Sequence, residues 1–143
     1  MTSENPNIRS VRPAAGRALA VVWKNGLESV IDVSEHLRRY AVFAPLLSDD
    51  RAFRTASVGE WGWSVHWTND MEISADTLFR LALDQGAARI RAWREAHGMT
   101  QTVAASALGI SPRMWRYYES AERLLPKTVR LAFAGFDAQD RAA

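Results

Sequence analysis

The sequence predicts an α+β fold: a small antiparallel sheet with one or two helices, followed by an all-α domain. Two observations predict it. Up to about residue 82, short runs rich in β-branched and aromatic residues alternate with turn residues, as in antiparallel strands. From Ala87 onward the apolar residues recur at helical spacing. We therefore expect two domains, residues 1–84 and residues 87–143, that join near Asp84-Gln85-Gly86.

The first three strands are expected at residues 8–12, 18–23 and 27–33. Lys24-Asn25-Gly26 separates the second strand from the third, and Asn-Gly is a strong hairpin signal. A two-residue turn of this kind places both of its residues at positive φ. Three more strands are expected at residues 51–55, 61–67 and 71–73, with Thr68-Asn69-Asp70 as the last turn.

The segment from Trp61 to Trp67 alternates large and small side chains. Trp61, Trp63, Val65 and Trp67 fall on one face, which is the pattern of a half-buried strand. The tryptophans could form a ligand platform, but such a stripe more often belongs to a core. His66 lies on the other face without a second ligand at useful spacing, so we expect no metal site and no cofactor.

Capping residues locate the helices. In the first domain Ser34 caps a short helix that reaches Tyr40, and Ser74 or Asp76 caps a helix that continues to Ala82. In the second domain four helices are expected: Ala87–His97, Gln101–Ala107, Pro112 to about Ser120, and one from Pro126. The corresponding cap signals are Gly98 after the first of these four helices, Thr100 before the second and Ser111 before the third.

The second and third of these helices form a helix-turn-helix, the supersecondary motif of many DNA-binding domains. Ala104-Ala105 is small, so the helices can approach closely, and Gly109 permits positive φ in the turn. Ile110 can fill the angle between the helices. Trp115 and Tyr118, three residues apart, give the third helix an inward face.

The register of this motif carries a resemblance. The run Met99-Thr100-Gln101 … Ala105 … Leu108-Gly109-Ile110-Ser111 … Trp115 … Tyr118-Glu119-Ser120 closely resembles the phage-repressor (Cro/C1, XRE-like) helix-turn-helix family, over about residues 90–133. The resemblance implies a lambda-repressor-like domain that binds double-stranded operator DNA as a homodimer. The N-terminal part of its third helix would enter the major groove.

The resemblance assigns roles to individual residues. Arg113 and Arg116 would read bases, because arginine bonds guanine O6 and N7 in a bidentate manner. Glu119 occupies an acidic position that we interpret as structural. Pro112 stands where many relatives have a polar base-reading residue, and the fifth helix is expected to be short or missing. The complete expected DNA-binding set is Gln101, Ser111, Arg113, Met114, Arg116, Tyr117, Arg123 and Lys127, with Gln101, Ser111, Arg123 and Lys127 on the phosphate backbone.

The N-terminal domain carries a second resemblance. Trp23-Lys24-Asn25-Gly26, Ile31-Asp32-Val33, Phe43-Ala44-Pro45-Leu46, Phe53-Arg54 and Ile73 to Leu78 look like the small α+β family catalogued as domain of unknown function 2442. Members are commonly bacterial, and some lie near toxin–antitoxin genes. The resemblance implies a fold without an activity. This domain could dimerise or sense a partner.

Composition narrows the function classes. Of the 143 residues 48% are hydrophobic and 24% charged, as in ordinary globular proteins. No apolar run approaches the roughly 18 residues of a membrane span, and the N-terminus lacks the apolar stretch of a signal peptide. There is no cysteine. We expect a soluble cytoplasmic protein that is not an enzyme, since no nucleophile elbow, phosphate loop or HExxH motif is present.

Charge favours a polyanionic partner for the second domain. Residues 1–86 hold 9 basic and 11 acidic residues, whereas residues 87–143 hold 9 basic and 5 acidic residues. Basic excess favours nucleic acid, because neutralised phosphates release counterions. The charge agrees with what the phage-repressor resemblance implies, which is sequence-specific binding of double-stranded DNA by a transcriptional regulator that acts as a dimer. The alternative is a protein-interaction module, such as an antitoxin-like partner of a toxin.

Overall fold

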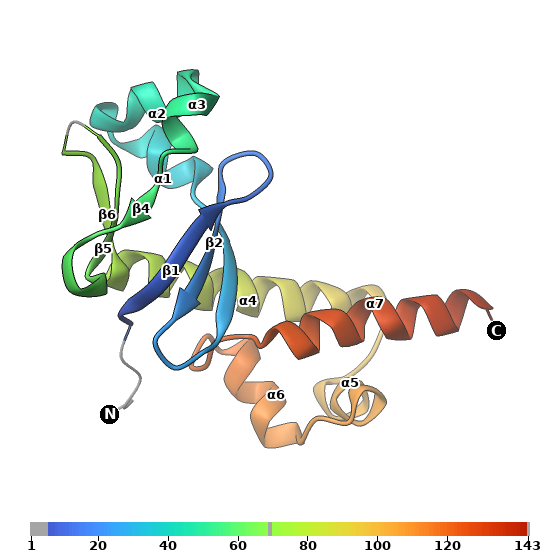
Figure 1. The fold of residues 1–143 in the computed structure, drawn as a ribbon. Coiled ribbons are helices and arrows are strands. Elements are labelled where there is room, and N and C mark those ends of the chain that lie inside the picture. Colours follow the sequence, from blue (N-terminus) through green and yellow to red (C-terminus); the bar gives the residue numbers. More distant parts are fainter. Residues whose placement is uncertain (1–5, 69, 143) are drawn as a thin grey trace. The chain divides into compact units, whose positions relative to one another are not determined.

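The computed structural model describes residues 6–68 and 70–142. The chain divides into two compact units, Met1–Ala82 and Leu83–Ala143. The first unit combines strands with short helices and the second is helical (Figure 1), so the predicted α+β class is confirmed. No helix among the described residues is long and apolar enough to cross a membrane.

The first sheet contains β1 (Ile8–Pro13), β2 (Ala18–Trp23) and β3 (Glu28–Asp32), which pair antiparallel in that order. The three predicted strands are confirmed. The central strand β2 supplies most of the buried side chains, because Leu19, Val21 and Trp23 are all inaccessible to solvent. This alternation along β2 places its apolar side chains in the core of the first unit.

The β2–β3 hairpin differs from the predicted two-residue turn. Only Gly26 has positive φ (90°), and its N–H donates to the Trp23 carbonyl while the Trp23 N–H donates to Leu27. The loop therefore has three residues, with a β-turn followed by a left-handed glycine. The Asn25 side chain accepts from the Leu27 N–H at 2.9 Å, which holds asparagine at negative φ.

Short helices follow β3, and two predictions on them are wrong. Ser34 begins α1 and does not cap it, since both its N–H and its hydroxyl donate to Asp32 Oδ1. The strand predicted at residues 51–55 is helical, because the Asp49 carboxylate accepts from two amides of the first turn there. The bounds are α1 Ser34–Arg39, η1 Ala41–Phe43, α2 Ala44–Ser48 and α3 Asp50–Phe53.

A second antiparallel sheet contains β4 (Ser57–Val58), β5 (Ser64–His66) and β6 (Glu72–Ser74). The predicted single sheet with one or two helices is thus corrected to two sheets with several short helices. β5 lies in the second half of the strand predicted at residues 61–67, and β6 agrees within a residue with the strand predicted at residues 71–73. The turn expected at Thr68-Asn69-Asp70 is described only in part, since residue 69 lies outside the described residues.

The predicted tryptophan strand is largely absent. Its first residues form η2 (Glu60–Gly62), in which Trp61 has φ 59°. Gly62 has φ 76°, and a Cβ there would lie 2.4 Å from the Ile8 carbonyl oxygen, so β1 allows no larger residue. Trp67 is buried as predicted, but Trp61 is 74% and Trp63 58% exposed. The backbone conformation of this segment therefore depends on the close approach of Gly62 to β1, and the alternation of side chains does not predict it.

Helix α4 (Ala75–Ala96) has 22 residues. Ser74 caps it, since its hydroxyl oxygen accepts from the Thr77 N–H at 3.1 Å. The two helices that the sequence predicted on either side of Asp84-Gln85-Gly86 are therefore one helix. Gly86 is tolerated for a packing reason, because a Cβ at this position would lie 3.0 Å from Leu125 Cβ.

The second unit completes its fold with α5 (Gln101–Leu108), α6 (Pro112–Glu119) and α7 (Lys127–Ala142). These agree with the predicted helices within a residue or two. α7 extends to the end of the described residues, which contain no fifth helix in this unit. The core is formed by Ile90, Trp93, Ala104, Ala105, Trp115, Tyr118, Leu125, Val129 and Phe133.

Candidate nucleic-acid interface

The candidate site is built on α5, α6 and the turn between them. Thr100 caps α5 by accepting from the Val103 N–H, and Ser111 caps α6 by accepting from the Met114 N–H. Gly109 has φ 71°, and the Ile110 N–H donates to the Ala105 carbonyl. This is the six-to-one bond of a Schellman motif, which ends α5 and redirects the chain into α6. The predicted helix-turn-helix is confirmed.

The inward face of α6 is anchored in the aromatic core. Trp115 is inaccessible to solvent and Tyr118 is 8% exposed. The Trp115 ring lies 6.2 Å from that of Trp93, which in turn stacks on Phe133 at 5.1 Å. Because Ala104 and Ala105 add little bulk, α5 can pack closely on this cluster. The opposite face of α6 is thereby held toward solvent in a fixed orientation.

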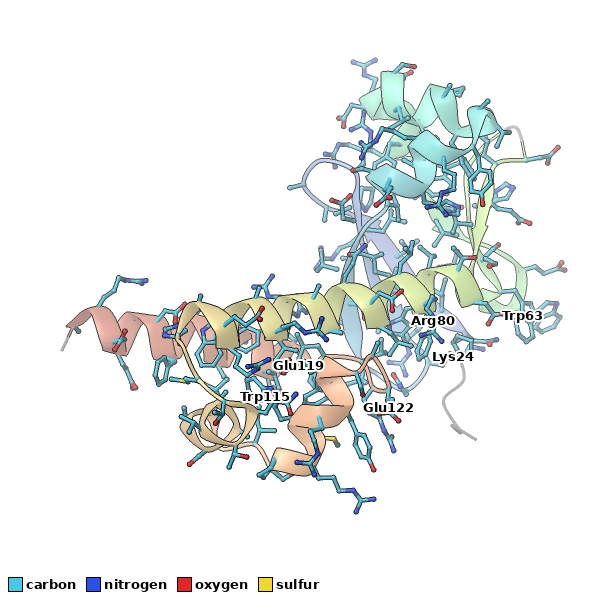
Figure 2. All side chains as sticks on the ribbon, turned by 180° about the vertical axis from the view of Figure 1, so that it is seen from behind. Lys24, Trp63, Arg80, Trp115, Glu119 and Glu122 are labelled. Atoms are coloured by element: carbon cyan, nitrogen blue, oxygen red, sulfur yellow. The ribbon has the colours of Figure 1, made fainter. Side chains whose placement is uncertain are left out.

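Glu119, the last residue of α6, connects α4, α5 and α6, and Figure 2 shows it near Trp115. Its carboxylate accepts from Arg94 Nη2 at 2.6 Å and from Trp115 Nε1 at 2.8 Å. Arg91 also pairs with it at 3.4 Å. Burial alone would raise the pKa of Glu119, but hydrogen bonds from Arg94, Trp115 and Gln101 outweigh burial and lower the pKa to about 2. Glu119 is thus a charged structural residue.

The exposed face of α6 carries Arg113, Arg116 and Tyr117. Both arginines are exposed, and Arg113 Nε donates to the Tyr117 hydroxyl at 3.0 Å. Arg123, in the segment after α6, lies over the same ring, with its Cζ 5.7 Å from the ring centroid. The fourth predicted residue, Met114, is half-buried against the core. Arg113, Arg116 and Tyr117 therefore supply the polar side chains that α6 presents to solvent.

The remaining predicted residues lie at helix ends. Lys127 is the exposed first residue of α7, and the Ser111 hydroxyl serves as the α6 cap. The Gln101 side chain bonds Glu119. In the part of the chain that the structure describes, no ion pair neutralises the four cations of the basic face, by which we mean Arg113, Arg116, Arg123 and Lys127.

Comparison with known proteins agrees with this architecture. A family model described as protein of unknown function (DUF2442) matches residues 8–84, which is more than half of the chain. The chain belongs to this family. A second model, a helix-turn-helix domain, matches residues 87–142. Both resemblances found in the sequence are thereby confirmed.

A solved structure matches nearly the whole chain. The crystal structure of "Putative DNA Binding Protein NE0471" from Nitrosomonas europaea is similar with a TM-score of 0.51 and 32% sequence identity. The alignment covers 92% of this chain and 86% of that one. No curated protein matches the chain.

Sequence reasoning missed Arg91 and Arg94. Each lies more than twenty residues from Glu119 in the sequence, so their pairing depends on how α4 packs against α6. The spacing of the two arginines, one helical turn apart on α4, was the available signal. It indicates a shared face but does not identify the carboxylate that the face meets.

Proposed function

We propose that the chain binds double-stranded DNA through α6. The observation that carries this proposal is the basic face, in which Arg113 and Arg116 project from a helix whose other side is fixed by Trp115. A recognition helix of this kind places its N-terminal residues against base edges in the major groove. The helix-turn-helix match and the name of the Nitrosomonas europaea relative support the proposal.

The neighbouring polar groups suit the phosphate backbone. Arg123 and Lys127 would neutralise phosphates and set the position of α6 on the duplex. Gln101 can take part as well. A carboxylate only accepts hydrogen bonds, so Gln101 gives Glu119 one amide N–H and retains its second N–H for a phosphate oxygen.

We further propose that the protein is a transcriptional regulator, which recognises a defined DNA sequence as a homodimer. Arginine side chains bond guanine in a bidentate manner, which gives sequence preference. Two copies would contact half-sites about one helical turn apart, so the operator would be a palindrome. This role implies a cytoplasmic location and binding without catalysis.

A binding selection tests the proposal. Purified protein is offered a random duplex library and its own upstream region, at low and at moderate salt. An enriched palindrome with the stated spacing supports a dimeric, sequence-specific binder. Binding without sequence preference that disappears at moderate salt would reject the regulator.

Variants of α6 test the assigned face. Arg113→Ala combined with Arg116→Ala should abolish sequence preference. The matched control is Arg89→Ala with Arg141→Ala, which removes the same charge from exposed positions on α4 and α7. If the first pair of changes left the selected sequence unaltered, α6 would not be the reading helix.

A second candidate function is protein binding by the first unit. Trp61 and Trp63 are more than half exposed, and exposed tryptophans are enriched in protein interfaces. The partner could be a second copy of this chain or a separate protein, as for an antitoxin-like partner of a toxin. Sedimentation of the wild type and of Trp61→Ser with Trp63→Ser decides whether these side chains support self-association.

A further inference from the structure

Tyr117 connects two arginines of the basic face. Its hydroxyl oxygen accepts from Arg113 Nε at 3.0 Å. The guanidinium carbons of Arg113 and Arg123 lie 5.6 and 5.7 Å from the centre of its ring. Tyr117 is half-buried whereas both arginines are exposed. A half-buried ring therefore contacts two long side chains that are themselves exposed.

The hydrogen bond determines which edge of Arg113 remains available. A guanidinium has five N–H donors in a planar fork, and Tyr117 takes the one on Nε. The four N–H groups of the terminal nitrogens stay unpaired among the described residues. One N–H from each terminal nitrogen matches the O6 and N7 acceptors of guanine.

We propose that Tyr117 is a specificity-determining residue that positions Arg113 to read one guanine through its terminal N–H groups. This proposal rests on the proposed function. Holding Nε restricts the rotamers of Arg113 before it meets DNA, so less side-chain freedom is lost on binding. The preference for a G·C pair at that position then depends on the Tyr117 hydroxyl as well as on Arg113.

Arg123 provides the matched comparison. It contacts the same ring, but the bond to the Tyr117 oxygen comes from Arg113. We assign Arg123 to a phosphate, where a cation strengthens binding to all sequences alike. Loss of Arg123 should therefore lower affinity for all duplexes without changing base preference. Loss of the Tyr117 hydroxyl should instead lower the preference for the G·C pair and leave affinity for unrelated duplex nearly unchanged.

The experiment measures the dissociation constants of full-length protein for the selected duplex and for the same duplex with one G·C pair replaced by A·T. The pair to replace is the one at which Arg113→Ala loses its preference. Tyr117→Phe, which keeps the ring, should lower the preference about 3- to 10-fold, measured as the constant for the A·T-replaced duplex divided by that for the selected duplex. Its affinity for unrelated duplex should stay within about twofold of the wild type.

Two further variants keep the test decisive. Arg113→Lys retains the charge without the fork and without the Nε donor that bonds Tyr117, so it should reduce the preference. Arg123→Gln should weaken binding to both duplexes equally. An unchanged ratio in Tyr117→Phe, or a preference that Arg113→Lys retains in full, overturns the proposal. A wild type that selects no sequence overturns the proposed function itself, which is a distinct result.

Discussion

At the scale of single residues, Glu119 connects three helices of the second unit. It binds Arg94 of α4, Gln101 of α5 and Trp115 of α6. A buried carboxylate is stable only when its oxygens are fully paired, and these donors satisfy that need. The sequence indicated a structural role for Glu119 but not its partners, since a helical spacing cannot specify a contact between helices.

The pKa of Glu119 leads to a pH prediction. Because the folded pKa is about 2 and its ordinary value is 4.5, its contribution to stability is present above about pH 4.5 and is lost as the pH falls toward 2. Glu119→Gln should lower the free energy of unfolding at pH 7 by about 2–3 kcal/mol. Chemical denaturation from pH 7 to pH 3 measures how this difference shrinks.

Glu95→Gln is the control for Glu119. It makes the same chemical change at an exposed position of α4. A difference from the wild type that is equally large in Glu95→Gln, or that does not vary with pH, would contradict the assigned role of the Glu119 charge.

Ala121 leads to a second residue-scale prediction. It follows α6 with φ 63°, and the Glu122 N–H donates to the Tyr117 carbonyl as in a Schellman motif. This conformation is unfavourable for alanine by about 1 kcal/mol and open to glycine. Ala121→Gly should therefore raise the melting temperature. Ala134→Gly, on the exposed side of α7, should lower it by the usual helix penalty; if both variants moved the same way, the strain would be disproved.

At the scale of elements, the starts of the capped helices α4, α5 and α6 could be predicted, whereas α3 could not. Thr100, Ser111 and Ser74 each bond an amide in the first turn of the helix they were expected to cap. α3 has four residues, which is too short for apolar periodicity to distinguish it from a strand. The tryptophan strand failed for another reason, because its alternation was interrupted by a backbone contact between Gly62 and β1.

The tryptophans provide a prediction for this segment. Trp67→Ala should destabilise the first unit by about 3–5 kcal/mol, because a buried indole is lost. Trp61→Gly should change stability by less than about 1 kcal/mol, since it removes an exposed side chain and relieves the positive φ. Urea unfolding followed by circular dichroism compares the two. A large loss in Trp61→Gly would mean that this indole is packed.

At the scale of the whole molecule, two family matches meet between residues 84 and 87. The sequence placed the change of pattern there, from strand alternation to helical spacing. It did not show that the backbone remains helical through this point, because glycine favours a break unless packing selects it. The basic residues of the second unit fall into two groups: Arg91 and Arg94 form ion pairs with Glu119, whereas the basic face forms none with the described residues.

The cations of the basic face lead to a prediction about the salt dependence of DNA binding. Affinity should fall by about tenfold or more over a few-fold rise in salt if several phosphates are contacted. Lys127→Ala should weaken binding to all sequences and reduce the slope of log K against log salt by about 1. Arg113→Ala should mainly relax base preference. Fluorescence anisotropy over a salt series measures both, and equal slopes for wild type and Lys127→Ala would remove Lys127 from the interface.

The continuity of α4 decides how the chain can be divided into fragments. A fragment that begins at Ala87, at the border between the two family matches, would start in mid-helix with its first four amide N–H groups lacking acceptors. It would also lack Gly86, which lies against Leu125. A fragment that begins at Ser74 retains the natural cap and the whole helix. The border between the two family matches is therefore an unsuitable place to cut, because one uninterrupted helix begins in the first matched region and ends in the second.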